Sequence, residues 1–201
     1  MRVSPALISP SVAAERLAMR LLHDDPMRLA HVRSAALAAA DLTRVLKHPY
    51  AADIVAAAWL HDIGYSPGID RTGFHPLDGA LYLAGQGWPD RIVMLVAHHS
   101  YAALMAPYFS VDHLLSLIDH VPGTAEDVLA YADLIAGHDG TGNTPQQRIE
   151  EMRNRHDATQ NVPLEIREIR YKLLTAAADK VHTDLRQADA PVRLSLRCRR
   201  P

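Results

Sequence analysis

Apolar residues recur at the three- and four-residue spacing of amphipathic helices along most of the chain, and no segment keeps the alternating pattern of a β-strand. Asp25 followed by Pro26 is typical of an N-cap and a first helical turn, and it predicts a helix through about Lys47. Pro49 predicts the start of a second helix, which continues through the apolar run 54–60. The first third of the chain is therefore expected to contain two helices.

The same signals predict two helices in the middle of the chain. Gly64 is expected to end the second helix, because glycine accepts the left-handed backbone conformation of a helix C-cap. A loop follows, and His75 with Pro76 predicts the start of a third helix. The dipeptide Trp-Pro at 88–89 predicts a fourth, which is expected to end near His98.

The last third of the chain is also helical in pattern. Two capping boxes, in which each side chain bonds to the other residue's backbone N–H, are predicted at Thr124 with Asp127 and at Thr144 with Gln147. A long terminal helix is predicted over 164–187, and its apolar face is expected to contain Ile166, Ile169, Leu173 and Leu174. The pattern as a whole predicts an all-α fold.

Length and composition indicate one domain. A chain of 201 residues suits a single domain with one hydrophobic core. Residues 11–190 are assigned to that domain, residues 1–10 to a flexible N-terminal segment, and residues 191–201 to a basic C-terminal tail with four arginines and no acid.

Charge and cysteine content exclude several classes of function. The formal net charge of −2 indicates neither a nucleic-acid partner nor an acidic membrane surface. The single cysteine, Cys198, excludes an intrachain disulfide and a zinc site built from thiolates. No apolar run reaches the length of a membrane span and no signal-peptide pattern follows Met1, so a cytoplasmic location is expected.

The dipeptide His61-Asp62 stands where the second predicted helix ends. Adjacent residues in mid-helix point about 100° apart, but at a helix terminus both side chains can turn toward one metal ion. A carboxylate has two oxygens, so Asp62 is the natural ligand to bridge two ions. A structural reading remains open, in which His61 interacts with the helix dipole and Asp62 caps the next turn.

Asp133 and His31 are two further polar residues that are candidate metal ligands. Asp133 lies in an apolar helical stretch, where an unpaired carboxylate is costly unless it binds a partner or a metal. His31 is similarly surrounded by apolar residues. The alternatives are an aspartate on a narrow polar stripe and a core histidine with a hydrogen-bond partner.

The order His31, His61-Asp62, Asp133 resembles the pattern of the HD superfamily of metal-dependent phosphohydrolases, over roughly residues 27–140. The resemblance implies a compact multi-helix bundle around a metal site, with these four residues as ligands and Asp62 often bridging to a second ion. The stretch 61–65 is similar to the His-Asp-Ile-Gly-Lys form of the family, except that Tyr65 replaces a lysine and so removes one candidate phosphate contact. Segments 72–80 and 96–100 are similar to small actinobacterial HD proteins, which implies no particular substrate.

A second metal ion is expected from two more histidines at helix ends. In binuclear HD proteins, two extra histidines lie between the His-Asp pair and the final aspartate, and we assign them to His75 and His98. His99 is either an alternative ligand or a contact to substrate; in a structural reading, His75 is an N-cap and one histidine of the doublet packs. Imidazole and carboxylate ligands suit manganese, iron, cobalt, nickel or zinc, and two divalent ions are expected.

The resemblance implies hydrolysis of a phosphate ester of a small molecule, with nucleotides among the candidates, by a water molecule that the metals activate. Asp62, Asp133 and His99 are the expected catalytic residues. Arg28 and Arg71 are the expected substrate contacts, because the guanidinium fork binds phosphate; solvated surface arginine is the alternative. Two rival functions remain open: a diiron oxygenase similar to myo-inositol oxygenase, with the same ligands, and a regulator that binds a nucleotide without turnover.

Overall fold

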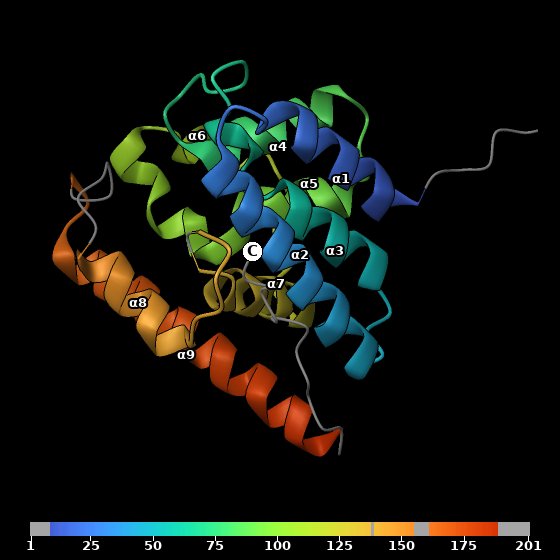
Figure 1. Ribbon diagram of the computed structural model, residues 1–201. Helices are drawn as coiled ribbons and strands as arrows, with labels where there is room; N and C mark the ends of the chain where they lie inside the picture. The colour runs from blue at the N-terminus through green and yellow to red at the C-terminus, as the bar shows by residue number, and fades with distance from the viewer. Residues whose placement is uncertain (1–8, 138, 155–160, 189–201) are drawn as a thin grey trace, which may run out of the picture.

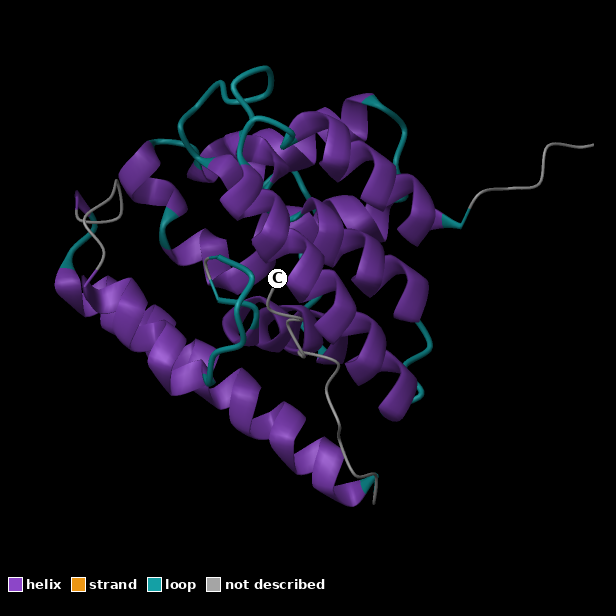
Figure 2. Ribbon diagram, viewed as in Figure 1, coloured by secondary structure: helices purple, strands orange, loops and turns teal. Residues whose placement is uncertain are grey.

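The computed structural model describes residues 9–137, 139–154 and 161–188, and within these ranges every regular element is a helix (Figures 1 and 2). The all-α prediction is confirmed. The nine α-helices of the described residues are α1 (Pro10–Leu21), α2 (Pro26–Val45), α3 (Ala51–Leu60), α4 (His75–Gly85), α5 (Asp90–His98), α6 (Asp112–Leu115), α7 (Thr124–Ile135), α8 (Pro145–Asn154) and α9 (Leu164–Gln187). Three short 3₁₀ helices are η1 (Ile63–Tyr65), η2 (His99–Leu104) and η3 (Ala106–Phe109).

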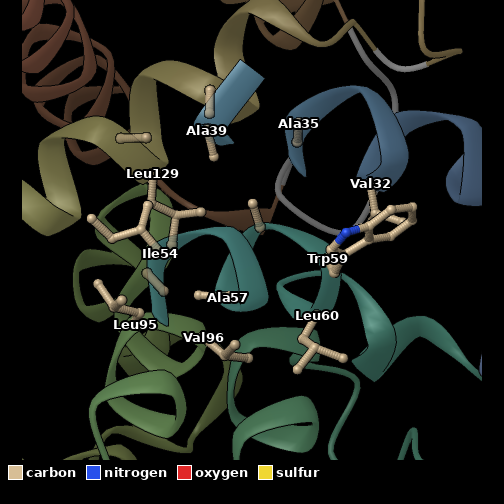
Figure 3. Close-up of a cluster of buried hydrophobic side chains, with 14 of the residues drawn as sticks. Val32, Ala35, Ala39, Ile54, Ala57, Trp59, Leu60, Leu95, Val96 and Leu129 are labelled. Carbon is tan, nitrogen blue, oxygen red and sulfur yellow. The ribbon is translucent and has the colours of Figure 1, made fainter. Parts of the chain in front are cut away.

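Helices α2, α3 and α7 pack against one another at the centre of the bundle (Figure 1). Helix α1 covers α3, α5 packs on α3 and α4, and α8 and α9 lie against α7. Ala35 and Ala39 of α2 and Ala57 of α3 are buried between larger side chains such as Ile54 and Leu129 (Figure 3). Small side chains let helix axes approach closely, so the alanine-rich sequence produces a tight bundle.

Of the three side-chain caps predicted at helix starts, two have the expected geometry. The Asp25 side chain accepts a hydrogen bond from the backbone N–H of Arg28 at 2.9 Å, which caps α2. Thr144 and Gln147 form a reciprocal capping box before α8, with N···O distances of 2.9 and 3.1 Å.

The capping box predicted at Thr124 is wrong. Helix α7 begins at that residue without a side-chain cap, because the Thr124 hydroxyl is 2.9 Å from Nε2 of His48. The other proposed partner, Asp127, forms an ion pair with Lys180 of α9. Contacts with other segments thus replace the local capping interaction.

Helix α9 has the predicted bounds but a different buried face. Its buried residues Tyr171, Leu174, Ala178 and Val181 follow the three- and four-residue spacing of one stripe. Ile169 is 44% exposed and Leu173 is 37% exposed, so of the four residues predicted for the face only Leu174 is fully buried. The helix carries two apolar stripes, and packing on α7 selects the one that contains Leu174.

The sequence pattern does not single out α1 or the short helices between His99 and Leu115. The predicted domain boundary at residue 10 falls on the first residue of α1. Residues 1–8 and the predicted tail 191–201 lie outside the described residues. None of the helices in the described ranges combines the length and the apolar character that a membrane-spanning segment requires.

Candidate metal centre

Six side chains from five helices converge beside the central helices. His31 comes from α2, Asp133 from α7, and His61 with Asp62 from the end of α3. His75 begins α4, and His99 directly follows α5. They form two groups, His31 with His61 and Asp133, and Asp62 with His75 and His99, and within each group the candidate ligand atoms lie within 4.8 Å of one another.

The first group has the spacing of ligands around one ion. Nε2 of His31 is 3.1 Å from Nε2 of His61 and 3.1 Å from Oδ1 of Asp133. Nε2 of His61 is 3.7 Å from the same Asp133 oxygen. Ligand atoms bound at about 2.0–2.1 Å to one tetrahedral or octahedral ion lie roughly 2.8–3.4 Å apart. Two of the three observed distances lie in this range and the third, 3.7 Å, is slightly longer, so the triangle is close to one face of such a site.

Three of the four histidines present a fixed nitrogen to the centre. Nδ1 of each ring lies at hydrogen-bond distance from a backbone carbonyl, which can only accept, so in the neutral ring Nε2 carries the lone pair. Two such lone pairs facing each other, as in His31 and His61, repel unless a cation lies between them. Histidines that bind metals in proteins are oriented in this way. The rings and their carbonyl acceptors are His31 with Gly137 at 2.5 Å, His61 with Ala58 at 2.9 Å and His99 with Val96 at 2.7 Å.

Asp62 belongs to the second group and also lies next to the first. Its Oδ1 is 3.4 Å from Nε2 of His75 and 4.0 Å from Nε2 of His99. The same oxygen is 3.6 Å from Nε2 of His61, a member of the first group. The rings of His75 and His99 approach each other to 3.2 Å between their Nε2 atoms. Asp62 therefore has the position that a bridging ligand requires.

Gly64 helps to place His75 in the second group, but not as the predicted left-handed C-cap. It lies inside η1 and its φ is not positive. A Cβ atom at this position would lie 2.1 Å from the carbonyl oxygen of His75, closer than any side chain can come. Glycine is needed here because the first residue of α4 approaches the η1 backbone closely.

His98 does not join the centre: the structure places His99 in the second group instead, which corrects the position expected for His98. Nε2 of His98 is 3.1 Å from the carbonyl oxygen of Ile118, and its ring stacks on His120 with centroids 4.3 Å apart. Helix α5 ends at His98, and the backbone of His99 is extended, with φ −53° and ψ 147°. The two adjacent rings therefore point in different directions.

Both carboxylates of the centre are held ionised. Burial raises the pKa of Asp62, but the charges of His61 and other cationic neighbours outweigh burial and hold this pKa far below its ordinary value. Burial likewise raises the pKa of Asp133, but its hydrogen bond with His31 and further charge interactions hold the pKa well below the ordinary range. Ionised carboxylates are the form that binds metal.

The histidines differ in protonation. Burial lowers the pKa of His75 well below its ordinary value and, together with the charge of His61, lowers that of His99 to about 4. Both rings are therefore neutral near pH 7. Burial also acts to lower the pKa of His31, but the contact with Asp133 outweighs it and raises the pKa. Metal binding requires the neutral ring, so an ion at this nitrogen would displace a proton from protonated His31.

Ser100 holds one of the carboxylates of the centre through a hydrogen bond. It was not identified as a site residue from the sequence. Its hydroxyl donates to Oδ2 of Asp133 at 2.6 Å, and its carbonyl accepts from Nε of Arg170 at 2.7 Å. Ser100 and Tyr101 both have left-handed backbone conformations, with φ of 53° and 58°, which are unfavourable for residues other than glycine. The sequence signal is only the position of Ser100 after the histidine doublet, and that position does not reveal its partners.

A cavity of about 1080 Å³ opens onto the centre. Arg28 lines it as expected, with Nη1 2.7 Å from Oδ2 of Asp62 and Cζ 3.6 Å above the ring of Tyr65. Arg71 does not line the cavity, because it lies on an exposed loop where its guanidinium contacts the carbonyl of Gly68. The expected substrate contact at Arg71 is therefore wrong.

The opposite wall of the cavity comes from two helices without predicted site residues. Its side chains include Gln147, Arg148, Glu151 and Asn154 of α8, and Arg170 and Tyr171 of α9. Most of this wall is polar, and it carries both signs of charge. His138, which the sequence places near Asp133, lies outside the described residues.

Two buried groups of histidine and aspartate, each able to hold a metal ion, are the main functional feature of the described part of the chain. Comparisons with protein-family models, with curated proteins and with solved structures gave no match. The donor chemistry of the two groups is therefore the basis for assigning a function.

Proposed function

We propose that the chain is an HD-type metal-dependent phosphohydrolase that cleaves a phosphate ester of a small molecule. The observation that carries the proposal is the arrangement of six ligands in two groups joined by Asp62, with the imidazoles of His31, His61 and His99 oriented by backbone carbonyls. The order of the ligands along the chain resembles that of the HD superfamily, with His75 and His99 as the additional pair.

The donor set fits two transition-metal ions. Four imidazole nitrogens and two carboxylates suit manganese, iron, cobalt, nickel or zinc, and disfavour calcium, which prefers oxygen ligands throughout. His31, His61 and Asp133 would hold one ion, and Asp62, His75 and His99 the other. When bound, such ions lower the pKa of a water molecule and withdraw charge from a phosphoryl oxygen.

The side chains around the proposed ligands orient them, and one ligand is placed to accept the proton of the attacking water. Arg28 fixes Oδ2 of Asp62, so that Oδ1 of that carboxylate faces the histidines. Asp133 lines the cavity and is ionised, and its Oδ2 is held by the Ser100 hydroxyl. Asp133 is therefore placed to accept a proton from the attacking water. The one lone-pair nitrogen of His99 would bind the second ion, so the proton-transfer role expected for His99 does not fit its position.

The size of the cavity favours a small-molecule substrate. Binding sites for small ligands have volumes of roughly 300–1,000 Å³. The cavity at the centre, with about 1080 Å³, is large enough for a phosphorylated metabolite of nucleotide size. Arg28 would attract its phosphate by charge.

Metal analysis followed by a phosphatase screen tests the proposal. The purified chain is analysed for metals, stripped with a chelator and reloaded with each candidate ion, and then assayed for phosphate release from nucleotides and sugar phosphates. We expect activity that is absent in the stripped protein and returns with one or more transition metals. A chain that contains iron and consumes oxygen would instead support the oxygenase, and tight nucleotide binding by metal-loaded protein without turnover would support the regulator.

A further inference from the structure

A buried arginine of α8 lines the cavity that opens onto the centre. Arg148 is only 7% exposed, although it belongs to a strongly polar helix, and it lines the same cavity as His31 and Asp133. Burial of a guanidinium is costly unless it is paired. Its one side-chain hydrogen bond within the described residues goes to Glu151, with Nη1 3.2 Å from Oε2.

The hydrogen bond to Glu151 holds Arg148 in place and uses one of the five N–H donors of its guanidinium. Oε1 of Glu151 accepts from the amide of Asn143 at 3.0 Å, so the carboxylate is itself fixed by the segment before α8. The capping box at Thr144 fixes the first turn of that helix. A guanidinium has five N–H donors in a planar fork, which matches the geometry of a phosphate.

The charge of Arg148 acts on the first ligand group. Arg148 lines the same cavity as His31 and Asp133, and charges in a partly buried site are only weakly screened by solvent. Loading both groups with divalent ions would place more positive charge beside this buried cation than the carboxylates of Asp62 and Asp133 neutralise. Such an arrangement favours an anion in the cavity between them.

We propose that Arg148 binds the phosphoryl group of the substrate on the side away from the metal centre. This inference rests on the proposed phosphohydrolase function and adds a binding residue from outside the histidine and aspartate ligands. Arg148 holds the phosphoryl oxygens through its fork, and Glu151 keeps the fork oriented. Arg28 is less suited to this role because its guanidinium already pairs with Asp62.

Inorganic phosphate is the probe that tests the inference. Its affinity is measured by calorimetry for metal-loaded wild type, Arg148→Gln, Arg148→Lys and Glu151→Gln, with metal content and melting temperature recorded for each. Arg153→Gln is the matched control, because Arg153 is on the same helix but pairs with Glu168 away from the cavity.

Loss of the guanidinium should weaken phosphate binding by roughly 10- to 100-fold, the range for hydrogen bonds to a charged group. Arg148→Lys should recover part of the loss, and Arg153→Gln should bind like the wild type. Glu151→Gln keeps a side-chain carbonyl oxygen that can accept the hydrogen bond from Arg148 and so keep the fork oriented. This variant should therefore bind phosphate as well as the wild type or better, because a negative charge is removed from the cavity. If the role of Arg148 were only to hold α8 in place, Glu151→Gln should instead lose as much phosphate affinity as Arg148→Gln.

Unchanged phosphate affinity in Arg148→Gln, or equal losses in Arg148→Gln and Glu151→Gln, would overturn the inference and leave the phosphohydrolase proposal intact. Failure of metal-loaded wild type to bind phosphate at all would count against both. Phosphate affinity decides between the two roles of Arg148. If affinity is lost in Arg148→Gln and partly recovered in Arg148→Lys, the inference holds even where Arg148→Gln also contains less metal.

Discussion

The two ligand groups differ in how firmly their side chains are held. In the first group, His31 and His61 are 3% and 1% exposed, and each Nδ1 bonds to a backbone carbonyl. In the second group only His99 has such a bond. The His75 side chain is 23% exposed and its ring stacks on Tyr65, with centroids 4.0 Å apart.

Under the proposed function, this difference predicts that the two groups would bind their ions with unequal affinity. Ligands that are oriented before the ion binds lose less conformational freedom on binding, so the first group should bind its ion more tightly. The second group includes a histidine at the first residue of a helix, where the backbone of η1 must be in place. The second ion is therefore expected to exchange more readily.

The largest effect is expected from Asp62→Ala, which removes the carboxylate that contacts both groups. Turnover should fall by more than the roughly 10- to 100-fold that loss of an outer partner costs, and both ions should bind more weakly. Metal content and phosphate release measure the two effects. Asp90→Ala is the control, because Asp90 is exposed at the other end of α5. Full turnover with both ions retained would contradict the bridging position.

The double change His75→Ala with His99→Ala should empty the second group alone. Metal content is expected to fall from about two ions toward one per chain, with turnover reduced by orders of magnitude because a two-metal site loses one of its ions. The measurement is metal stoichiometry after dialysis. His98→Ala is the matched control, since its ring bonds to the Ile118 carbonyl outside the centre. A larger metal loss in the control would reverse the assignment of the doublet.

Gly64→Ala should affect the second group and the stability of the fold. The added Cβ would meet the His75 carbonyl oxygen at 2.1 Å, so α4 has to shift at its first residue. Overpacking of this kind costs about 1–3 kcal/mol in the free energy of unfolding. Denaturant unfolding measures that cost, and metal titration should show weaker binding of the second ion only. Gly68→Ala is the control, because nothing lies within 4 Å of a Cβ there.

Ser100→Ala should produce the smallest effect, and on the first group. Removal of the hydroxyl leaves Oδ2 of Asp133 without its 2.6 Å hydrogen bond, while Oδ1 still faces His31. Affinity for the first ion should fall about tenfold, the lower end for an outer partner. Competition with a metal-sensitive dye measures this affinity. Ser116→Ala, at a serine that only bonds to the carbonyl of His113, should have no effect on it.

The first group could be predicted from the sequence through the order of its residues along the chain. Taken singly, the aspartate in an apolar helical stretch and the His-Asp pair at a helix end left structural readings open, and their order with His31, which resembles the HD pattern, predicted them as ligands. The doublet at 98–99 is different. Which of its two rings reaches Asp62 depends on the backbone turn after α5, and no local pattern encodes that turn.

The sequence by itself determined the helical class, most helix starts and the bounds of α9, because periodicity and capping act within a few residues. The tertiary structure alone decided the buried stripe of α9, the need for glycine at position 64 and the choice of His99. It also placed the Ser100 hydroxyl against Asp133, and Arg148 in the lining of the same cavity as Asp133. These features depend on contacts between segments that the chain folds together, and such contacts leave no regular spacing in the sequence.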